Sequence, residues 1–306
     1  MAILSTIDAL GSLDGPVHLA IGVFDGVHRG HQAVLQSAST SAKAIGGHSV
    51  VATFHPHPAE VLAPDKAPKR LTPLSHQISL FKQLGIETTL AFPFDCLIAE
   101  LTAETFIEKL KATCQLASIH VGSDWAFGKG RRGDLRLLQK LGSMHEFEVH
   151  GIAPVLEFDI RISSTTIRQT ISQGDLATAK RLLGRPYSLY GEVVHGDHLG
   201  RQLGFPTANL DIATQALPPY GVYIVHLISH QNRPGIANLG VRPTVDGKHA
   251  LRFEVHLLDW EGDLYGQVAE ATFLHQLRPE KRFAGLPELR DQIDHDLTQA
   301  REWLSA

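Results

Sequence analysis

The hydrophobic pattern of this chain changes once, near Gly184, and this change constrains the fold more than any other feature. Before it, apolar runs typical of buried strands alternate with amphipathic helical stretches. After it, short segments rich in β-branched residues are separated by Gly, Pro, Asp or Asn. We therefore predict two domains, residues 1–185 and residues 186–306.

The two patterns predict different architectures. Alternating strands and helices indicate an α/β domain with a doubly wound, mainly parallel sheet, whose ligands bind beyond the carboxyl ends of its strands. The short β-rich segments indicate an antiparallel barrel or sandwich. The buried strands of the first domain are predicted over residues 17–24, 48–54, 87–92 and 117–122. A helix that ends the chain is predicted from the spacing of Leu286, Leu289, Ile293, Leu297 and Leu304.

Composition excludes several classes of protein. The 306 residues, 43% hydrophobic and 20% charged, are enough for two globular cores. A net charge of -4 argues against a general nucleic-acid binder. No apolar run approaches the roughly 18 residues of a membrane span, and the start lacks a signal peptide. With two cysteines, Cys96 and Cys114, no disulfide framework is expected, so we predict a cytoplasmic protein without nucleic-acid or membrane partners.

The segment GVFDGVHRGH, residues 22–31, follows the first predicted strand. Gly22 and Gly26 permit a tight turn, and His28 and His31 are spaced so that both face one ligand at a helix N-terminus. Such a terminus binds phosphates. The alternatives are a simple helix cap or a partial metal site, and some tRNA synthetases carry a similar HxGH signature.

Other polar segments fall at the same sheet edge or at a helix start. TFHPHP ends the second strand with His57 and Pro58, and VGSDWAFGKGRRGD follows the fourth with Asp124. ISSTTIR places hydroxyls at a helix start and Arg168 one turn later, which suits a phosphate clamp. Taken singly, these segments are an ordinary turn, a solvated basic loop and a helix cap.

The segment GRQLGFPTANL, residues 200–210, is the stronger signal. Gly200 and Gly204 make a flexible phosphate loop, and Pro206 stiffens the approach to Thr207 and Asn209. A hydroxyl and an amide oxygen are hard ligands suited to Mg²⁺ that bridges ATP phosphates. A hairpin turn explains Gly-Phe-Pro but leaves the PTAN run unexplained.

Glu254 lies in an alternating strand, where it shares one face with Arg252 and His256. An exposed strand carboxylate is the commoner state of a glutamate.

In their order along the chain, the first four segments resemble the adenylyltransferase module of bifunctional riboflavin kinase/FAD synthetases. GRQLGFPTANL, NLGVRPTV, FEVHLLD and LRPEKRF resemble the riboflavin kinase module, so the resemblance covers most of both halves. It implies a nucleotidylyltransferase domain followed by a kinase barrel. It also implies phosphorylation of riboflavin to FMN and adenylylation of FMN to FAD, with ATP as co-substrate and Mg²⁺ as cofactor.

The resemblance also implies site residues. The catalytic residues would be His28, His31 and Glu254, with Glu254 accepting the proton of the riboflavin 5′-hydroxyl. ATP would be bound by Gly22, Phe24, Asp25, Gly26, Gly30, Ser164, Thr165, Arg168, Gly200, Gly204 and Pro206. The flavin would be bound by His57, Pro58, Asp124, Arg278 and Phe283, and the metal by Thr207 and Asn209.

Two positions depart from the family pattern, and both bear on the flavin pocket. Trp125 stands where a phenylalanine is expected, and His55 stands where an acidic residue is expected. Two other functions remain as alternatives: an enzyme with only one active module, and a flavin-nucleotide sensor or carrier without turnover. The intact HxGH and PTAN motifs, together with Glu254, argue against both.

Overall fold

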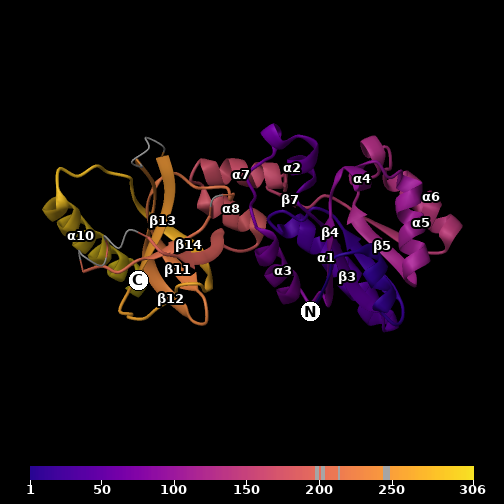
Figure 1. The fold of residues 1–306 in the computed structure, drawn as a ribbon, viewed down its shortest axis with the longest axis horizontal. Coiled ribbons are helices and arrows are strands. Elements are labelled where there is room, and N and C mark those ends of the chain that lie inside the picture. The colour runs from indigo at the N-terminus through magenta and orange to yellow at the C-terminus, as the bar shows by residue number, and fades with distance from the viewer. Residues whose placement is uncertain (197–199, 201–203, 213, 244–248) are drawn as a thin grey trace. The chain divides into compact units, whose positions relative to one another are not determined.

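The computed structural model describes residues 1–196, 200, 204–212, 214–243 and 249–306 (Figure 1). Its chain contacts define two compact units, Met1–Ser164 and Thr165–Ala306. Each unit has its own sheet and its own apolar core.

The first unit is built on a six-stranded sheet in the order β1-β4-β3-β2-β5-β6. All neighbouring strands in this sheet are parallel. Its strands are β1 (Ala2–Leu4), β2 (Val17–Ile21), β3 (His48–His55), β4 (Thr88–Pro93), β5 (Leu116–Gly122) and β6 (Glu148–Ile152). The predicted parallel sheet is confirmed, and β1 and β6 extend it at both edges.

Helices cover both faces of this sheet, as a doubly wound fold requires. One apolar cluster joins α1 (Arg29–Ile45) and α3 (Leu74–Gln83) to one face, with Leu35 and Phe81 buried in it. A second cluster joins α5 (Ala103–Thr113) and α6 (Leu135–His145) to the other face. Shorter elements are η1 (Ile7–Ser12), α2 (Pro58–Leu62), η2 (Pro64–Lys66), α4 (Cys96–Ala99), η3 (Lys129–Arg131), β7 (Leu156–Glu157) and β8 (Ile160–Arg161).

The first strand is shorter than predicted. Residues 17–24 were expected to be extended, but β2 ends at Ile21 and Phe24 has a φ of 51°. The ring of Phe24 folds back over Gly22, where an added Cβ would lie 3.1 Å from it. The chain therefore leaves the sheet at this glycine and turns toward α1.

The second unit contains a closed barrel in the order β10-β13-β12-β11-β14-β9. Every neighbouring pair is antiparallel. Because β9 pairs with both β10 and β14, the sheet closes, which confirms the barrel and excludes the sandwich alternative. Its strands are β9 (Ser188–Val194), β10 (Ala208–Leu210), β11 (Gly221–Ile228), β12 (Asn232–Pro243), β13 (His249–Leu257) and β14 (Val268–Pro279). Two helices, α7 (Ser164–Ser172) and α8 (Leu176–Leu183), precede the barrel in the chain.

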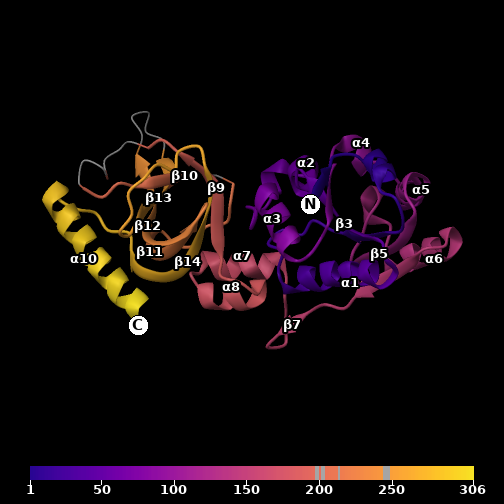
Figure 2. The same cartoon turned by 90° about the horizontal axis from the view of Figure 1, so that it is seen from below.

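The predicted final helix is present as α10 (Leu286–Ser305), which lies outside the barrel (Figure 2). Leu297 and Ala300 of α10 pack with Val222 and Ile224 of β11 in one apolar cluster. Tyr223 alternates with these two residues and is also buried. Because α10 covers the outer face, β11 is apolar on both sides and lacks the alternation of a half-exposed strand.

Candidate functional site

The glycine loop, residues 22–28, connects β2 to α1 at the carboxyl edge of the sheet. Gly26 has a φ of 89° and Val27 a φ of 42°, so the loop makes two left-handed steps before the helix. Only glycine adopts the first of these without strain. This turn brings the HxGH residues to the start of α1, as the sequence predicted.

His28 and His31 lie together at that helix N-terminus. His28 is the N-cap of α1, and its Nδ1 accepts a hydrogen bond from the His31 backbone N–H. The two rings stack with centroids 3.5 Å apart, and an added Cβ on Gly30 would lie 3.2 Å from the His28 ring. His28 is thus a helix cap, as one alternative held, and its ring also stacks on the ring of His31.

The surroundings of His31 favour its neutral imidazole. Burial, together with the neighbouring His28, holds the pKa of His31 well below its usual range. The Nδ1 atom of His31 is buried and has no hydrogen-bond partner among the described residues. Because His28 Nδ1 accepts a hydrogen bond, the proton of its neutral ring lies on Nε2, which makes that atom a donor.

Asp25 is predicted to bind ATP, but the structure shows its carboxylate turned toward the protein. The side chain is 3% exposed and accepts hydrogen bonds from the backbone N–H groups of Leu71 and Thr72. The hydroxyl of Ser164 donates to the Asp25 carbonyl at 2.8 Å. Asp25 therefore shapes the glycine loop from inside.

Ser164 is also the first residue of α7, so the expected hydroxyl at a helix start is present. Thr165 and Arg168 follow on the same helix, on the second unit's side of the division. Their binding of ATP stays a prediction.

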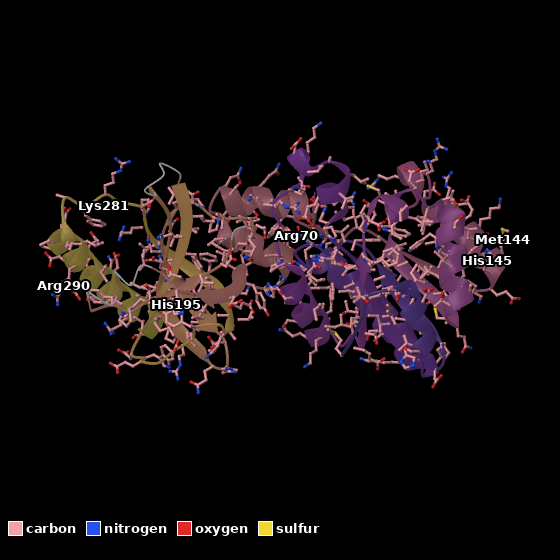
Figure 3. The ribbon with its side chains drawn as sticks, in the orientation of Figure 1. Arg70, Met144, His145, His195, Lys281 and Arg290 are labelled. Carbon is pink, nitrogen blue, oxygen red and sulfur yellow. The ribbon has the colours of Figure 1, made fainter. Side chains whose placement is uncertain are left out.

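The histidine–proline turn, residues 55–58, joins β3 to α2. His57 is the N-cap of α2 and Pro58 its first residue, and Glu60 completes a capping box with His57. Glu60 also pairs with Arg70, whose Nε and Nη2 donate to its two oxygens at 2.7 Å each. Arg70 is labelled in Figure 3. It was not assigned from the sequence, because its burial and its pairing with Glu60 depend on the tertiary structure.

Asp124 follows β5 at the same sheet edge as the glycine loop. It forms an ion pair with Arg161 of β8, and this hydrogen bond lowers the pKa of Asp124 below its usual range. Trp125 stacks flat on Phe127 with ring centroids 4.4 Å apart. Trp125 is partly buried against the apolar core.

In the second unit, the PTAN segment, residues 206–209, runs into β10. At Gly200, an added Cβ would lie 2.4 Å from the Phe205 carbonyl oxygen. At Gly196, an added Cβ would lie 2.3 Å from the Asn209 side-chain amide. Gly204 has a φ of 93°. The glycines therefore let the chain approach the Thr207 and Asn209 side chains closely. Residues 201–203, 244 and 245 of the quoted motifs lie outside the described residues.

A pocket of about 310 Å³ opens beside this segment. Pro206 and Thr207 contribute to one wall, and Trp260 and Tyr265 belong to the loop between β13 and β14. Tyr265 stacks on His195, labelled in Figure 3, with centroids 3.9 Å apart. The pocket combines aromatic surface with the Thr207 hydroxyl.

Glu254 lies on β13, as predicted, and its face of the strand is half-buried. Phe253 and Val255 are buried, whereas Arg252 and Glu254 form an ion pair at 3.5 Å with 24% and 28% of their side chains exposed. In the barrel, Glu254 lies opposite Asn209 of β10 on one side and Asn238 of β12 on the other. Directly opposite residues have Cβ atoms roughly 5 Å apart, so the predicted base and metal ligand are neighbours. Asn238 was not singled out, because strand order is not readable from local sequence.

His256 lies two residues further along this face. Its Nδ1 is 2.8 Å from the Pro206 carbonyl, which can only accept, so the imidazole donates. This hydrogen bond ties the start of the PTAN segment to β13.

Arg278 and Phe283 were predicted to bind the flavin. The Nε and Nη2 atoms of Arg278 donate to Asp296 of α10 at 2.9 Å and 2.8 Å, and Asp296 is 1% exposed. The Arg278 guanidinium lies 5.7 Å from the centre of the Phe283 ring. Arg278 therefore fastens β14 to α10, and its contact with a flavin stays a prediction.

Two family models match the chain, one over each half. The FAD synthetase model matches residues 12–166, and the riboflavin kinase model matches residues 183–304. Bifunctional riboflavin kinase/FMN adenylyltransferases are similar over nearly the full length. The one from Escherichia coli K12 is 43% identical over 93% of this chain and 92% of its own. The one from Bacillus subtilis is 35% identical over 94% of this chain and 92% of its own.

Similarity to solved structures also extends over both units. The crystal structure of a macrolide-efflux protein from Streptococcus pneumoniae has a TM-score of 0.83 and 30% identity, covering 99% of this chain and all of its own. In the part of this chain that the structure describes, no helix combines the length and apolar content needed to cross a membrane.

Proposed function

Because the chain belongs to the bifunctional riboflavin kinase/FMN adenylyltransferase family, we propose that its two units catalyse two consecutive reactions. The second unit phosphorylates riboflavin to FMN with ATP. The first unit adenylylates FMN to FAD and releases pyrophosphate. The pairing of Glu254 with Asn209 across β13 and β10 is the observation that best supports the kinase assignment. The free cysteines agree with a reducing cytoplasm.

In the kinase reaction, the riboflavin 5′-oxygen attacks the γ-phosphorus of ATP, and ADP leaves. Glu254 accepts the hydroxyl proton, and Arg252 holds its carboxylate in place through their ion pair. The nucleotide lies in the pocket against Trp260 and Tyr265, with its phosphates toward Thr207.

Mg²⁺ would fit the oxygen atoms of Thr207 and Asn209, which are hard ligands on one segment. The absence of a Cβ at Gly196 leaves room for the Asn209 amide that this role needs. When bound, the ion would neutralise charge on the transferred phosphate.

In the adenylylation reaction, an oxygen of the FMN phosphate attacks the α-phosphorus of ATP. This nucleophile is already anionic, so no general base is needed, and orientation and charge stabilisation supply the catalysis. His28 and His31 bind the phosphates at the α1 N-terminus, helped by the helix dipole.

The test is to incubate the purified protein with ATP, Mg²⁺ and either riboflavin or FMN, and to follow FMN and FAD by chromatography. FMN should form from riboflavin, and FAD should form from either flavin. Conversion of only one flavin would support the enzyme with a single active module. Binding without any product would support the sensor or carrier.

A substitution of Glu254 tests the mechanism. Glu254→Gln keeps size and removes the base, so riboflavin phosphorylation should fall by about 10²–10⁴-fold. Adenylylation of supplied FMN should hardly change. Glu192→Gln, an exposed carboxylate on β9 of the same barrel, is the matched control and should keep full kinase activity. Equal loss of both activities in Glu254→Gln would instead indicate misfolding or a shared site.

A further inference from the structure

Three consecutive residues of the first unit, Arg70–Thr72, lie between η2 and α3 and are almost completely buried. Arg70 is 8% exposed and Thr72 is 1% exposed. A buried arginine is costly unless it is paired, so its placement needs a specific partner. We call these residues the 70–72 connector.

One end of the connector holds the glycine loop. Leu71 N–H and Thr72 N–H donate to the Asp25 carboxylate at 2.9 Å and 3.0 Å. The Thr72 hydroxyl accepts from the Gly26 backbone N–H at 2.9 Å. The loop's left-handed step at Gly26 is thus fixed by a hydroxyl from outside the loop.

The other end holds the histidine–proline turn. Arg70 binds both oxygens of Glu60, and Glu60 Oε2 in turn accepts from the His57 backbone N–H at 3.2 Å. The hydrogen bond from Arg70 also lowers the pKa of Glu60, which keeps this carboxylate charged. A planar guanidinium with two parallel bonds fixes direction as well as distance.

The two sets of contacts start from residues only two positions apart, so their Cα atoms are at most about 7.6 Å from each other. We propose that the 70–72 connector is a positioning element of the adenylylation site. Thr72 holds the loop that binds ATP, and Arg70 holds the turn that shapes the flavin pocket. The connector thereby sets the distance between the two reactants. This inference rests on the function proposed above.

Substitutions at the two ends of the 70–72 connector should therefore change different kinetic constants, the KM for ATP at Thr72 and the KM for FMN at Arg70. Thr72→Val is isosteric but lacks the hydroxyl, which leaves Gly26 N–H without this partner in a buried site. Its KM for ATP in adenylylation should rise about tenfold, with the KM for FMN within about twofold of the parent. Thr72→Ser restores the hydroxyl and should return the KM for ATP to near the parental value.

Arg70→Met removes the ion pair with Glu60. It should raise the KM for FMN about tenfold and change the KM for ATP little, the reverse of the result expected for Thr72→Val. FMN is an anion, so loss of any nearby cation could weaken its binding. Lys69→Met controls for this, because Lys69 is the exposed neighbour of Arg70 and lies outside the connector. Its KM values should be parental.

Circular dichroism of the same variants reports whether the first unit has folded and should match the parental spectrum, and riboflavin phosphorylation, which belongs to the second unit, should be unchanged. If Thr72→Val and Thr72→Ser behave alike, or if Arg70→Met and Lys69→Met behave alike, the connector does not position the reactants. The same conclusion follows if each variant shifts both KM values equally. A parental protein that makes no FAD from FMN would instead overturn the proposed function itself.

Discussion

At the residue scale, single side chains in both units combine a structural contact with a proposed chemical role. His28 caps α1 through Nδ1 and stacks on His31, yet it is also the residue expected to bind phosphate. His256 holds the Pro206 carbonyl on the same strand face as Glu254. A useful substitution at either residue must therefore keep its structural hydrogen bond while removing its proposed role in the reaction, or the reverse.

For His28, alanine and asparagine separate these effects. His28→Ala and His28→Asn should both reduce FAD formation from FMN strongly, because both lack the imidazole, and the His28→Ala/His31→Ala double variant should abolish it. Asparagine is a good N-cap, so only the alanine variants should lose stability, by about 1 kcal/mol. Thermal unfolding and FAD formation are measured together, and riboflavin phosphorylation should persist throughout. Parental FAD formation in the double variant would remove both histidines from the site.

For His256, the matched pair is asparagine and glutamine. The Asn amide nitrogen lies close to where the imidazole Nδ1 lies, whereas the Gln amide reaches toward Nε2. His256→Asn should therefore keep most kinase activity, and His256→Gln should lose about tenfold in kcat/KM for riboflavin as the PTAN segment loosens. Because Nδ1 donates in both the neutral Nδ1–H tautomer and the cation, the activity ratio of Asn variant to parent should not vary between pH 6 and 8. A ratio that does vary with pH would point to proton transfer by His256.

At the element scale, a hydrogen-bonded chain of buried polar groups joins the parallel sheet to α1. His18 of β2 bonds to Ser118 of β5 at 2.7 Å, and Ser118 bonds to His120 at 2.7 Å. His120 then bonds to Ser37 of α1 at 2.8 Å and stacks on His150 of β6. The helix that carries the HxGH motif is thus tied by hydrogen bonds to β5 and, through Ser118, to β2.

Burial, followed by the neighbouring His150 and His18, lowers the pKa of His120 to about 3. The unfolded chain binds this proton near pH 6.5, so the folded state loses stability as the pH falls below 6.5. The free energy of unfolding of the first unit should drop by about 1.4 kcal/mol between pH 7.5 and pH 5.5 from His120 alone. Burial lowers the pKa of His18 as well, which acts in the same direction, while Glu148 opposes it.

The measurement is thermal unfolding at pH 7.5, 6.5 and 5.5, followed by inactivation of FAD formation. His120→Gln removes the titrating group and should unfold with a smaller pH dependence in this range, although it is less stable at pH 7.5. An unchanged pH dependence in this variant would show that other groups cause the loss at low pH.

At the scale of the whole molecule, two units with separate cores contain the two predicted sites. The helices α7 and α8 group with the barrel, whereas the predicted boundary at residues 185 and 186 leaves them with the first domain. The family models leave residues 167–182 between them. The boundary therefore stays a prediction that fragments can test.

Two fragments that differ only in these helices make this test. Arg185–Ala306 keeps the whole barrel and α10 and should fold and phosphorylate riboflavin. Thr165–Ala306 should do the same with a higher melting temperature, because α8 buries Leu182 and Leu183. Circular dichroism and FMN formation are the measurements. An insoluble short fragment beside an active long one would move the boundary to residues 164 and 165.

The sequence by itself determined the two-part architecture and the family, because hydrophobic periodicity and contiguous motifs are local properties of the chain. It also placed His28 and His31 at a helix start and Glu254 on one strand face with Arg252 and His256, since spacing along a helix or strand sets which side chains share a face. Only the tertiary structure decided that Asp25 turns inward to Leu71 and Thr72, that Arg70 pairs with Glu60, and that Glu254 lies between Asn209 and Asn238. These contacts join segments far apart in the chain, and their partners depend on strand order and loop closure, which no local pattern encodes.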